Sequence, residues 1–315
     1  MQGVFGIDRF LNIKSAISPS WSPDGRNLAF LMNLTGSMQV WTVPREGGWP
    51  EQLTFFSDRI MEVAYSPTDD RLLVLKDNGG DERAQLYSLS ADGSEMTALC
   101  PAPGSMDAGV WSPDGRQIAF HSNRRSPAFF DLYQVQAEGG EPELLLQHGG
   151  TNRVSTFSPD GRYLLFTRHQ ASLVNGLYLL DLQTRYVRAL TDGDTIAYHG
   201  QVQWAPDSRG LYLVCDSDRE FRGLAFLSLE SGSLEWLATP EWDVEELKLS
   251  PDGTMLAYTV NAGGRSELWL RDLASGQSRP VELPQGVIAQ LSWAPGSDAL
   301  AFALAGYSRP ANIWV

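Results

Sequence analysis

The tetrapeptide Ser-Pro-Asp-Gly, intact or altered, occurs seven times along this chain of 315 residues. The prolines of the seven copies are Pro23, Pro67, Pro113, Pro159, Pro206, Pro251 and Pro295. Successive prolines are 44, 46, 46, 47, 45 and 44 residues apart, and so steady a period is typical of a repeat architecture. The period constrains the fold before any single residue is considered.

The third repeat shows what each copy encodes. The apolar run Gly109–Trp111 leads into the turn Ser112–Gly115, and a second apolar run, Gln117–Phe120, follows. Two strand-like runs around a Pro-Asp-Gly turn predict a β-hairpin, because proline presets one turn dihedral and glycine accepts a positive φ. The segments Asp131–Val135 and Glu143–Leu146 predict a third and a fourth strand.

A single unit of four strands cannot bury both faces of its own sheet. Seven such units packed face to face around an axis can, so the sequence predicts an all-β fold, a seven-bladed β-propeller with four antiparallel strands per blade. The unbroken period predicts one domain over residues 1–315. We interpret the aromatic residues before the turns as packing between blades, and they are Trp21, Tyr65, Trp111, Phe157, Trp204 and Trp293.

The last repeat ends in its third strand, at Asn312–Val315. Residues 9–13 precede the first hairpin, and Leu11 lies 12 residues before Pro23. The leucines of internal fourth strands lie at similar distances before the next proline. We therefore predict that residues 9–13 form the outermost strand of the last blade, which would close the ring and cover an exposed sheet edge.

Composition and charge indicate which binding partners and which cellular compartment to expect for this chain. The net charge of −14 and the pI near 4.7 argue against nucleic acid or an anionic membrane as a partner. Cys100 and Cys215 are too few and too far apart for a disulfide framework, which favours a reducing compartment. The first residues show no export signal and no window is apolar enough to span a membrane, so a cytoplasmic location is expected.

The search for catalytic chemistry finds no motif. The pentapeptide Gly-x-Ser-x-Gly of α/β-hydrolases is absent. The four histidines, His121, His148, His169 and His199, stand in separate contexts without metal-ligand spacing. We therefore expect no catalytic residues, no metal and no cofactor in this chain.

The candidate binding surface follows from topology. In an antiparallel four-stranded blade, the loops after strands two and four emerge on one face, and the Pro-Asp-Gly turns on the other. The long, irregular segments of the first face are residues 55–60, 77–84, 122–130, 167–175, 192–200 and 216–222. Inner strands that enter the channel from this face carry the binding candidates Glu62, Arg153, His199, Glu245 and Glu246. We expect a peptide or a partner domain to meet these residues, since functional residues concentrate on such loops.

The sequence Trp-Ser-Pro-Asp-Gly-Arg-x-Ile/Leu-Ala-Phe, at residues 21–30 and 111–120, resembles the TolB-like PD40 propeller repeats. The opening, at residues 9–14 and 18–25, and the ending, at residues 308–315, are similar to the N-terminal propeller of prolyl oligopeptidase-type serine peptidases, in their acylaminoacyl-peptidase-like branch. The resemblance covers essentially the whole chain.

In that family the propeller caps an α/β-hydrolase domain with a Ser-Asp-His triad and admits peptides while excluding folded proteins. The resemblance thus implies a non-catalytic propeller that gates access to a hydrolase domain absent from these residues. No residue here matches the motifs of the triad. Two alternatives stay open: a stand-alone TolB-like interaction propeller, and a propeller lyase or glycosidase working in the channel, which would need clustered acids or histidines on inner strands.

Overall fold

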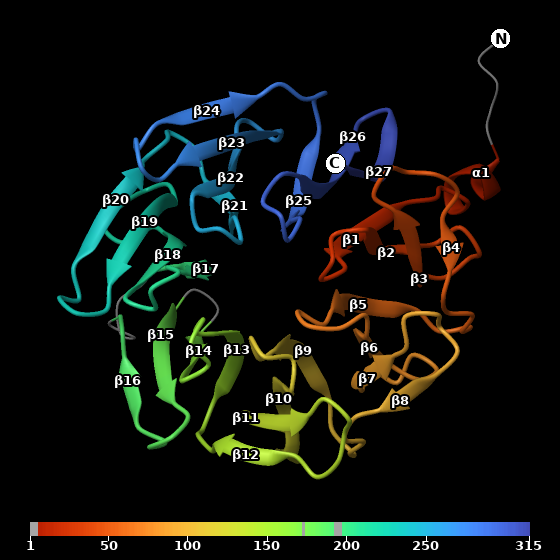
Figure 1. Ribbon diagram of the computed structural model, residues 1–315, viewed down its shortest axis with the longest axis horizontal. Helices are drawn as coiled ribbons and strands as arrows, with labels where there is room; N and C mark the ends of the chain where they lie inside the picture. Colours follow the sequence, from red (N-terminus) through yellow and green to blue (C-terminus); the bar gives the residue numbers. More distant parts are fainter. Residues whose placement is uncertain (1–5, 172–173, 192–196) are drawn as a thin grey trace.

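The computed structural model describes residues 6–171, 174–191 and 197–315. Antiparallel sheets are arranged around a central axis, and Figure 1 views the disc along that axis. The first strand of each group, from β1 to β25, lies nearest the axis, and later strands lie progressively further out. The one described helix is α1 (Ile7–Leu11). The expectation of an all-β fold is confirmed.

Strands follow one another through each sheet in chain order. The first two sheets contain β1 (Ala16–Trp21), β2 (Asn27–Met32), β3 (Gln39–Pro44), β4 (Glu51–Gln52), β5 (Ile60–Tyr65), β6 (Leu72–Lys76), β7 (Gln85–Leu89) and β8 (Met96–Ala98). An eight-stranded sheet contains β9 (Met106–Trp111), β10 (Gln117–Ser126), β11 (Phe129–Gln136), β12 (Glu143–Leu146), β13 (Thr151–Phe157), β14 (Tyr163–Ala171), β15 (Val174–Asp181) and β16 (Val187–Ala189). Its halves join through one parallel pair, Phe130 with Thr151.

The remaining strands form three sheets. Two have four strands, namely β17 (His199–Trp204), β18 (Gly210–Cys215), β19 (Gly223–Ser228) and β20 (Leu234–Ala238), then β21 (Val244–Leu249), β22 (Met255–Asn261), β23 (Ser266–Asp272) and β24 (Ser278–Val281). The last has three strands among the described residues, β25 (Val287–Trp293), β26 (Leu300–Gly306) and β27 (Arg309–Trp314).

The repeated tetrapeptide builds the turn between the first two strands of a sheet. The Ser22 hydroxyl donates to Asp24 Oδ1 over 2.6 Å, and the same hydroxyl oxygen accepts from the Asn27 N–H. The hydrogen bond from Ser22, followed by that from the Arg26 N–H, lowers the pKa of Asp24. Gly25 takes a φ of +70°, which a glycine adopts without strain. In the altered turns that follow Pro206 and Pro295, Ser208 and Ser297 adopt the positive φ instead.

Aromatic residues before the turns connect neighbouring sheets, as predicted. The indole N–H of Trp111 donates to the Ala64 carbonyl, and that of Trp293 donates to the Lys248 carbonyl. Each acceptor lies three residues before the turn proline of the preceding repeat. The apolar core lies between sheets in the same way, since one buried cluster joins Leu86 of β7 to Ile118 and Phe120 of β10. Each sheet therefore needs its neighbour in order to bury its faces.

The prediction of a closing strand at residues 9–13 is wrong. Residues 7–11 form α1, and its Ile7, Phe10 and Leu11 are exposed. Local bonds explain the difference, because Asn33 accepts from the Ser15 N–H and donates to the Ile13 carbonyl. These bonds hold the approach to β1 beside β2 instead of along β27.

The first and last sheets nevertheless pack against each other. Trp21 Nε1 donates to the Ser292 carbonyl, and the guanidinium of Arg45 pairs with Asp298 over 2.7 Å. Trp21 is also buried in an apolar cluster that includes Ala294 and Ala301 of the last repeat. Side-chain contacts therefore join the two ends of the repeat array.

We expect Trp111→Ala to destabilise the protein by about 2–3 kcal/mol, below the range of about 3–5 kcal/mol for a fully buried aromatic residue, because Trp111 is half-buried. Trp111→Phe keeps most of the packing and loses only the bond to Ala64, so it should cost about 1 kcal/mol. Chemical denaturation of both variants measures the losses. An unchanged midpoint for Trp111→Ala would contradict the assignment of this residue to the inter-sheet core.

Candidate interaction surface

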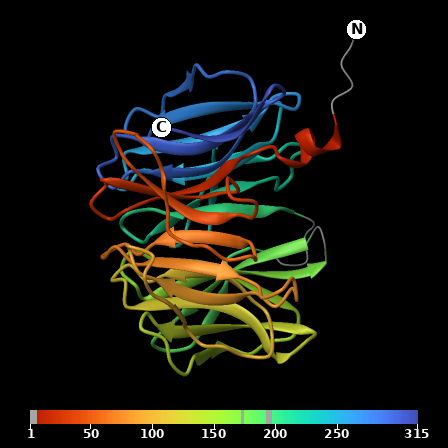
Figure 2. The ribbon, with the colours of Figure 1, turned by 90° about the vertical axis from the view of Figure 1, so that its right-hand side faces the viewer.

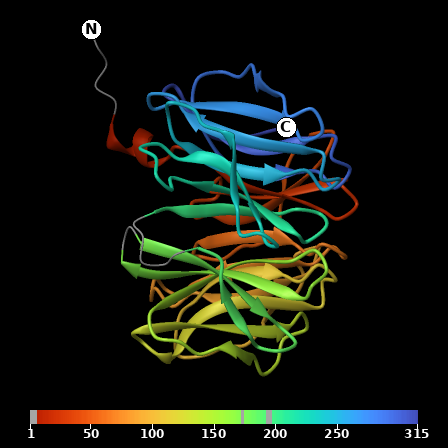
Figure 3. The same cartoon turned by 90° about the vertical axis from the view of Figure 1, so that its left-hand side faces the viewer.

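The two faces of the disc differ in what they expose. We define the loop face as the side carrying the connections after the second and fourth strands, and the turn face as the side carrying the proline turns. Figures 2 and 3 show the disc edge-on, with α1 beyond the face where β14 ends and β15 begins. Helix α1 therefore projects from the loop face.

Two of the predicted long loops are largely strand. Strand β10 continues to Ser126 and β11 begins at Phe129, because Ser126 still pairs with Phe129. Strands β14 and β15 likewise extend into the predicted segment 167–175. The hairpin ends replace the irregular loops that we expected there. Residues 172–173 and 192–196 of the predicted segments lie outside the described residues.

Exposed large apolar side chains gather on the loop face. Phe55 is 77 % exposed and Tyr307 is 97 % exposed. The described members of this set are Ile7, Phe10, Leu11, Ile13, Leu34, Phe55, Phe56, Met61, Phe129, Trp242, Val287 and Tyr307. On the turn face and the outer rim, the exposed large apolar residues of the described chain are Trp49, Leu144, Tyr186 and Val315. Apolar surface concentrated on one side is typical of a binding surface.

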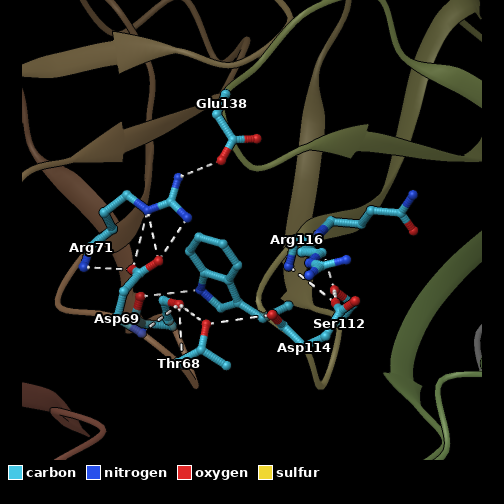
Figure 4. Close-up of polar contacts among 11 residues, drawn as sticks. Thr68, Asp69, Arg71, Ser112, Asp114, Arg116 and Glu138 are labelled. Carbon is cyan, nitrogen blue, oxygen red and sulfur yellow. Dashed lines mark hydrogen bonds and ion pairs between the residues drawn. The ribbon is translucent and has the colours of Figure 1, made fainter.

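The turn face, in contrast, is covered by polar contacts within the chain. Figure 4 shows one such network, in which Arg71 pairs with Asp69 and with Glu138. In the same view Thr68 Oγ1 donates to the Asp114 carbonyl over 3.5 Å. These bonds connect the turn of one repeat to that of the next. The turn face thus contributes to cohesion between sheets.

A hollow of about 590 Å³ opens beside the loop face between the last two four-stranded sheets. Pro240, Trp242, Tyr258 and Trp269 contribute its apolar wall. The Trp242 ring also lies 6.2 Å from that of Phe221, centroid to centroid. This volume suits an aromatic or aliphatic side chain of a docked polypeptide.

Every inner strand is irregular at a similar place. Each inner strand shifts register once where it pairs with the second strand of its group. The inner strands are β1, β5, β9, β13, β17, β21 and β25. Ser18, Gln201 and Gln290, each five residues before its turn proline, adopt a left-handed φ of 57°, 50° and 63°. Such bulges change the direction in which side chains point, and here they lie on the strands that line the axis. The tetrapeptide pattern alone could not show them.

Bulge residues also bond across the junction of the first and last sheets. The side-chain oxygen of Gln290 accepts from the Ser18 N–H over 2.7 Å, and the amide group of Gln290 donates to the Ser18 hydroxyl. These two bonds connect the inner strands of the first and last sheets.

Two predicted candidates, Glu62 of β5 and Arg153 of β13, expose their side chains on inner strands. Crowding by the surrounding sheets, together with the Asp107 carboxylate, raises the pKa of Glu62 although its side chain reaches solvent. Asp107 Oδ2 also lies 3.7 Å from Nε2 of His121, which is buried. The sequence analysis did not single out Asp107, and it set His121 aside because this residue lacks metal-ligand spacing.

His199 does not fit the expected role at the channel mouth. It is 5 % exposed, and its backbone N–H and ring bond to Asn175. Ser217 lies at 3.4 Å from the ring Nε2, and burial lowers the pKa of His199. His199 therefore joins the start of β17 to the start of β15, and its burial does not fit the expected contact with a ligand at the channel mouth.

Glu245 and Glu246 lie half-buried on β21. Glu245 accepts from the Asn261 amide over 2.8 Å. Burial raises the pKa of Glu246, although the Gln290 N–H and the nearby Lys248 act in the opposite direction. The channel wall here carries both signs of charge.

The arrangement defines a β-propeller with one apolar, loop-bearing face. The family model "TolB beta propeller domain" (PD40) matches residues 12–246, and the chain belongs to this family. This confirms the resemblance drawn from residues 21–30 and 111–120.

Among curated proteins, the chain is 27 % identical over 124 residues to the "Uncharacterized peptidase YuxL" of Bacillus subtilis, a match covering 38 % of this chain and 19 % of that protein. It is 29 % identical over 111 residues to the "Uncharacterized protein Atu1656" of Agrobacterium fabrum, covering 32 % and 38 %. The matches therefore span well under half the length of either relative.

Solved structures share the fold at low identity. A prolyl endopeptidase aligns with TM-score 0.79 and 15 % identity over 96 % of this chain and 48 % of that chain. An oligogalacturonate lyase in complex with manganese aligns with TM-score 0.78 and 16 % identity, over 95 % and 89 %. TolB from Acinetobacter baumannii aligns with TM-score 0.60 and 17 % identity, over 89 % and 66 %.

Two searches of the described residues gave no candidates. No group of three or more His, Cys, Asp and Glu side chains in this part of the chain could hold a metal ion. No helix within residues 6–171, 174–191 and 197–315 is long and apolar enough to cross a membrane.

We expect Glu62→Gln to raise the denaturant midpoint at pH 7, because a carboxyl group with a raised folded pKa is destabilising when charged. Below the ordinary glutamate pKa of 4.5 the carboxyl is protonated in both states, so the gain should vanish as the pH falls through this range. Glu51→Gln, at an exposed glutamate of β4, is the control. A gain that persists at pH 3 would contradict the assigned cause.

Proposed function

We propose that residues 1–315 form a single, non-catalytic propeller domain whose loop face caps a serine peptidase hydrolase domain and whose channel gates access of peptides to it. The proposal treats the strands as seven blades, from β1–β4 to β25–β27, and counts the eight-stranded sheet as two. The observation that carries it is the concentration of exposed apolar side chains on the loop face.

The contrast between the faces supports this orientation. A partner that covers Phe55, Trp242 and Tyr307 removes apolar surface from water, which stabilises the complex. The turn face offers mostly charged groups that are already paired, such as Arg71 with Asp69. Docking there would disturb existing bonds for little apolar burial.

The comparisons support the choice of partner class. One curated relative is named as a peptidase, and the prolyl endopeptidase aligns with this chain over 48 % of its own length. In the proposal, Glu62, Arg153, Glu245 and Glu246 meet the peptide as it passes the channel mouth. The alternative is a stand-alone TolB-like interaction propeller, in which the same face binds a separate protein.

The reading frame that follows codon 315 separates the two functions. A frame that continues into a segment with Gly-x-Ser-x-Gly supports the gating function, whereas an immediate stop codon overturns it and leaves the interaction propeller. In the continuous protein, the double variant Phe55→Ser with Trp242→Ser should weaken the contact between the loop face and the hydrolase domain. The rate of hydrolysis of a folded protein should then rise relative to that of a short peptide.

The matched control is Trp49→Ser with Tyr186→Ser, which removes two exposed aromatic residues from the turn face. The double variant Glu245→Lys with Glu246→Lys should change the rate at which short peptides are hydrolysed. Arg116→Glu, on the turn face, should leave this rate unchanged. Equal effects from the two faces would show that the loop face is not the docking surface.

Residues 1–315 alone should neither hydrolyse peptide or ester substrates nor react with a fluorophosphonate probe. The reason is that the sequence holds no nucleophile elbow of the α/β-hydrolase type. Mass spectrometry after probe treatment measures labelling, and an active serine peptidase serves as the positive control. Stoichiometric modification of one serine would overturn the non-catalytic assignment.

A further inference from the structure

Stacked aromatic rings recur at one place in the repeat. In the third repeat, Phe120 of β10 stacks on Tyr133 of β11 with ring centroids 5.7 Å apart. In the fourth repeat, Phe166 of β14 stacks on Tyr178 of β15 at 5.3 Å. The first ring of each pair lies seven residues after its turn proline, and the two residues of each pair are opposite each other in register. The position in the repeat therefore determines where these pairs form.

A cation from the end of the second strand covers each of these pairs. The guanidinium carbon of Arg124 lies 5.4 Å and 5.2 Å from the two ring centroids of the third repeat. That of Arg168 lies 5.7 Å and 4.5 Å from the two centroids of the fourth repeat. In the second repeat, the ammonium group of Lys76 lies 5.5 Å from the centroid of Tyr87. Three successive repeats thus place a cation of their own over the aromatic residue of the third strand, which is an attractive contact.

The sixth repeat has the aromatic pair without the cation. Tyr258 of β22 stacks on Trp269 of β23, with centroids 6.5 Å apart and planes 16° apart, and Tyr258 also lies seven residues after its turn proline. Two and four residues further on, at the places of the two covering arginines, this repeat has Val260 and Ala262. No lysine or arginine of the described chain lies over either ring as in the earlier repeats.

The space beside these rings is the hollow of about 590 Å³ at the loop face, and Tyr258, Trp269, Val260 and Ala262 all line it. It lies between two sheets that each have four paired strands. Trp242, which is 48 % exposed, adds a third aromatic ring from the connection between β20 and β21. The hollow therefore opens at the place where the third and fourth repeats hold a guanidinium group.

The charged groups beside the hollow also favour a cation. Glu267 lines it two residues before Trp269, and therefore lies on the same face of β23. The Glu267 carboxylate pairs with Arg265 over 3.4 Å, and both side chains reach solvent. Because an exposed pair of this kind contributes little stability, an incoming cation can replace Arg265 at this carboxylate. The chain charge of −14 adds a general attraction for cations.

We propose that this hollow binds an arginine side chain presented by the polypeptide that docks on the loop face. The guanidinium group stacks on Trp269 and pairs with Glu267, while the aliphatic stem packs against the apolar wall at Pro240. Arginine suits the hollow better than lysine, because its planar group stacks on aromatic faces and is more weakly hydrated. The inference rests on the proposed docking surface and adds the chemistry that the partner presents there.

The test compares two peptides that differ only in charge. One is acetyl-Gly-Gly-Arg-Gly-Gly-amide, and the other has citrulline, which keeps the shape of arginine without its charge. Nuclear magnetic resonance of the isotope-labelled protein reports binding through the indole N–H signals. The arginine peptide should shift the signals of Trp242 and Trp269 saturably, and it should bind at least about fivefold more tightly than the citrulline peptide.

Variants around the hollow test the assigned groups. Trp242→Leu and Glu267→Gln should each weaken binding of the arginine peptide at least about threefold. Arg265→Gln removes the cation that competes for Glu267, so it should strengthen binding about twofold. Trp49→Leu, at an exposed tryptophan outside the hollow, is the matched control and should bind as the unmodified protein does.

A further variant restores the cation that the sixth repeat lacks. Ala262→Arg places a guanidinium group at the position that Arg124 holds in the third repeat. It should abolish peptide binding and raise the denaturant midpoint, because the new side chain fills the hollow and lies over Trp269. Ala262→Gln, which adds an uncharged side chain, is its control and should leave the midpoint unchanged.

Three results would refute the proposal. Equal affinity for the two peptides would show that the hollow does not recognise the charge. Binding that Trp242→Leu, Glu267→Gln and Ala262→Arg all leave unchanged would place the site elsewhere. No binding at millimolar arginine peptide would show that the hollow accepts no guanidinium group. The reading frame after codon 315 tests the proposed function separately, so the two can fail independently.

Discussion

The structure depends on packing between neighbouring sheets. Each sheet is apolar on both faces, and no sheet can bury both faces by itself. The indole-to-carbonyl bonds of Trp21, Trp111 and Trp293 give this packing a fixed register, since each acceptor stands at the same place in its repeat. A change at one such residue therefore affects two sheets at once.

The same constraint explains why the two faces can differ. Cohesion is supplied by the sides of the sheets and by turn-face contacts such as Arg71 with Asp69 and Glu138. Bonds between sheets are also present on the loop face, such as that of Asn152 to the Phe130 carbonyl, but its exposed apolar side chains are not part of them. Exposed Phe55, Trp242 and Tyr307 are difficult to explain as elements of stability, and they are the basis of the proposed docking surface.

The channel wall and the loop face differ in their chemistry. The channel wall carries the polar side chains of Glu62, Arg153 and Glu246 on its inner strands, whereas the loop face exposes large apolar side chains.

Local chemistry made much of the fold predictable. The bonds among Ser22, Asp24 and Asn27 lie within six residues, so the turns, the strand order and the repeat period follow from the sequence itself. The position of Trp111 between sheets also follows, because a repeated aromatic residue in a sheet protein needs a neighbour to pack against. Strand register alone also placed Glu62, Arg153, Glu245 and Glu246 on inner strands, where the structure has them.

Only the tertiary structure decided the remaining features, because they depend on residues far apart in the chain. Asn175 makes His199 a buried structural residue, and Asn33 turns the segment before β1 away from the edge of β27. The inner-strand bulges arise where sheets meet around the axis, as the contact of Ser18 with Gln290 across 272 residues illustrates. A repeat pattern describes each unit by itself, whereas these features depend on how the units meet.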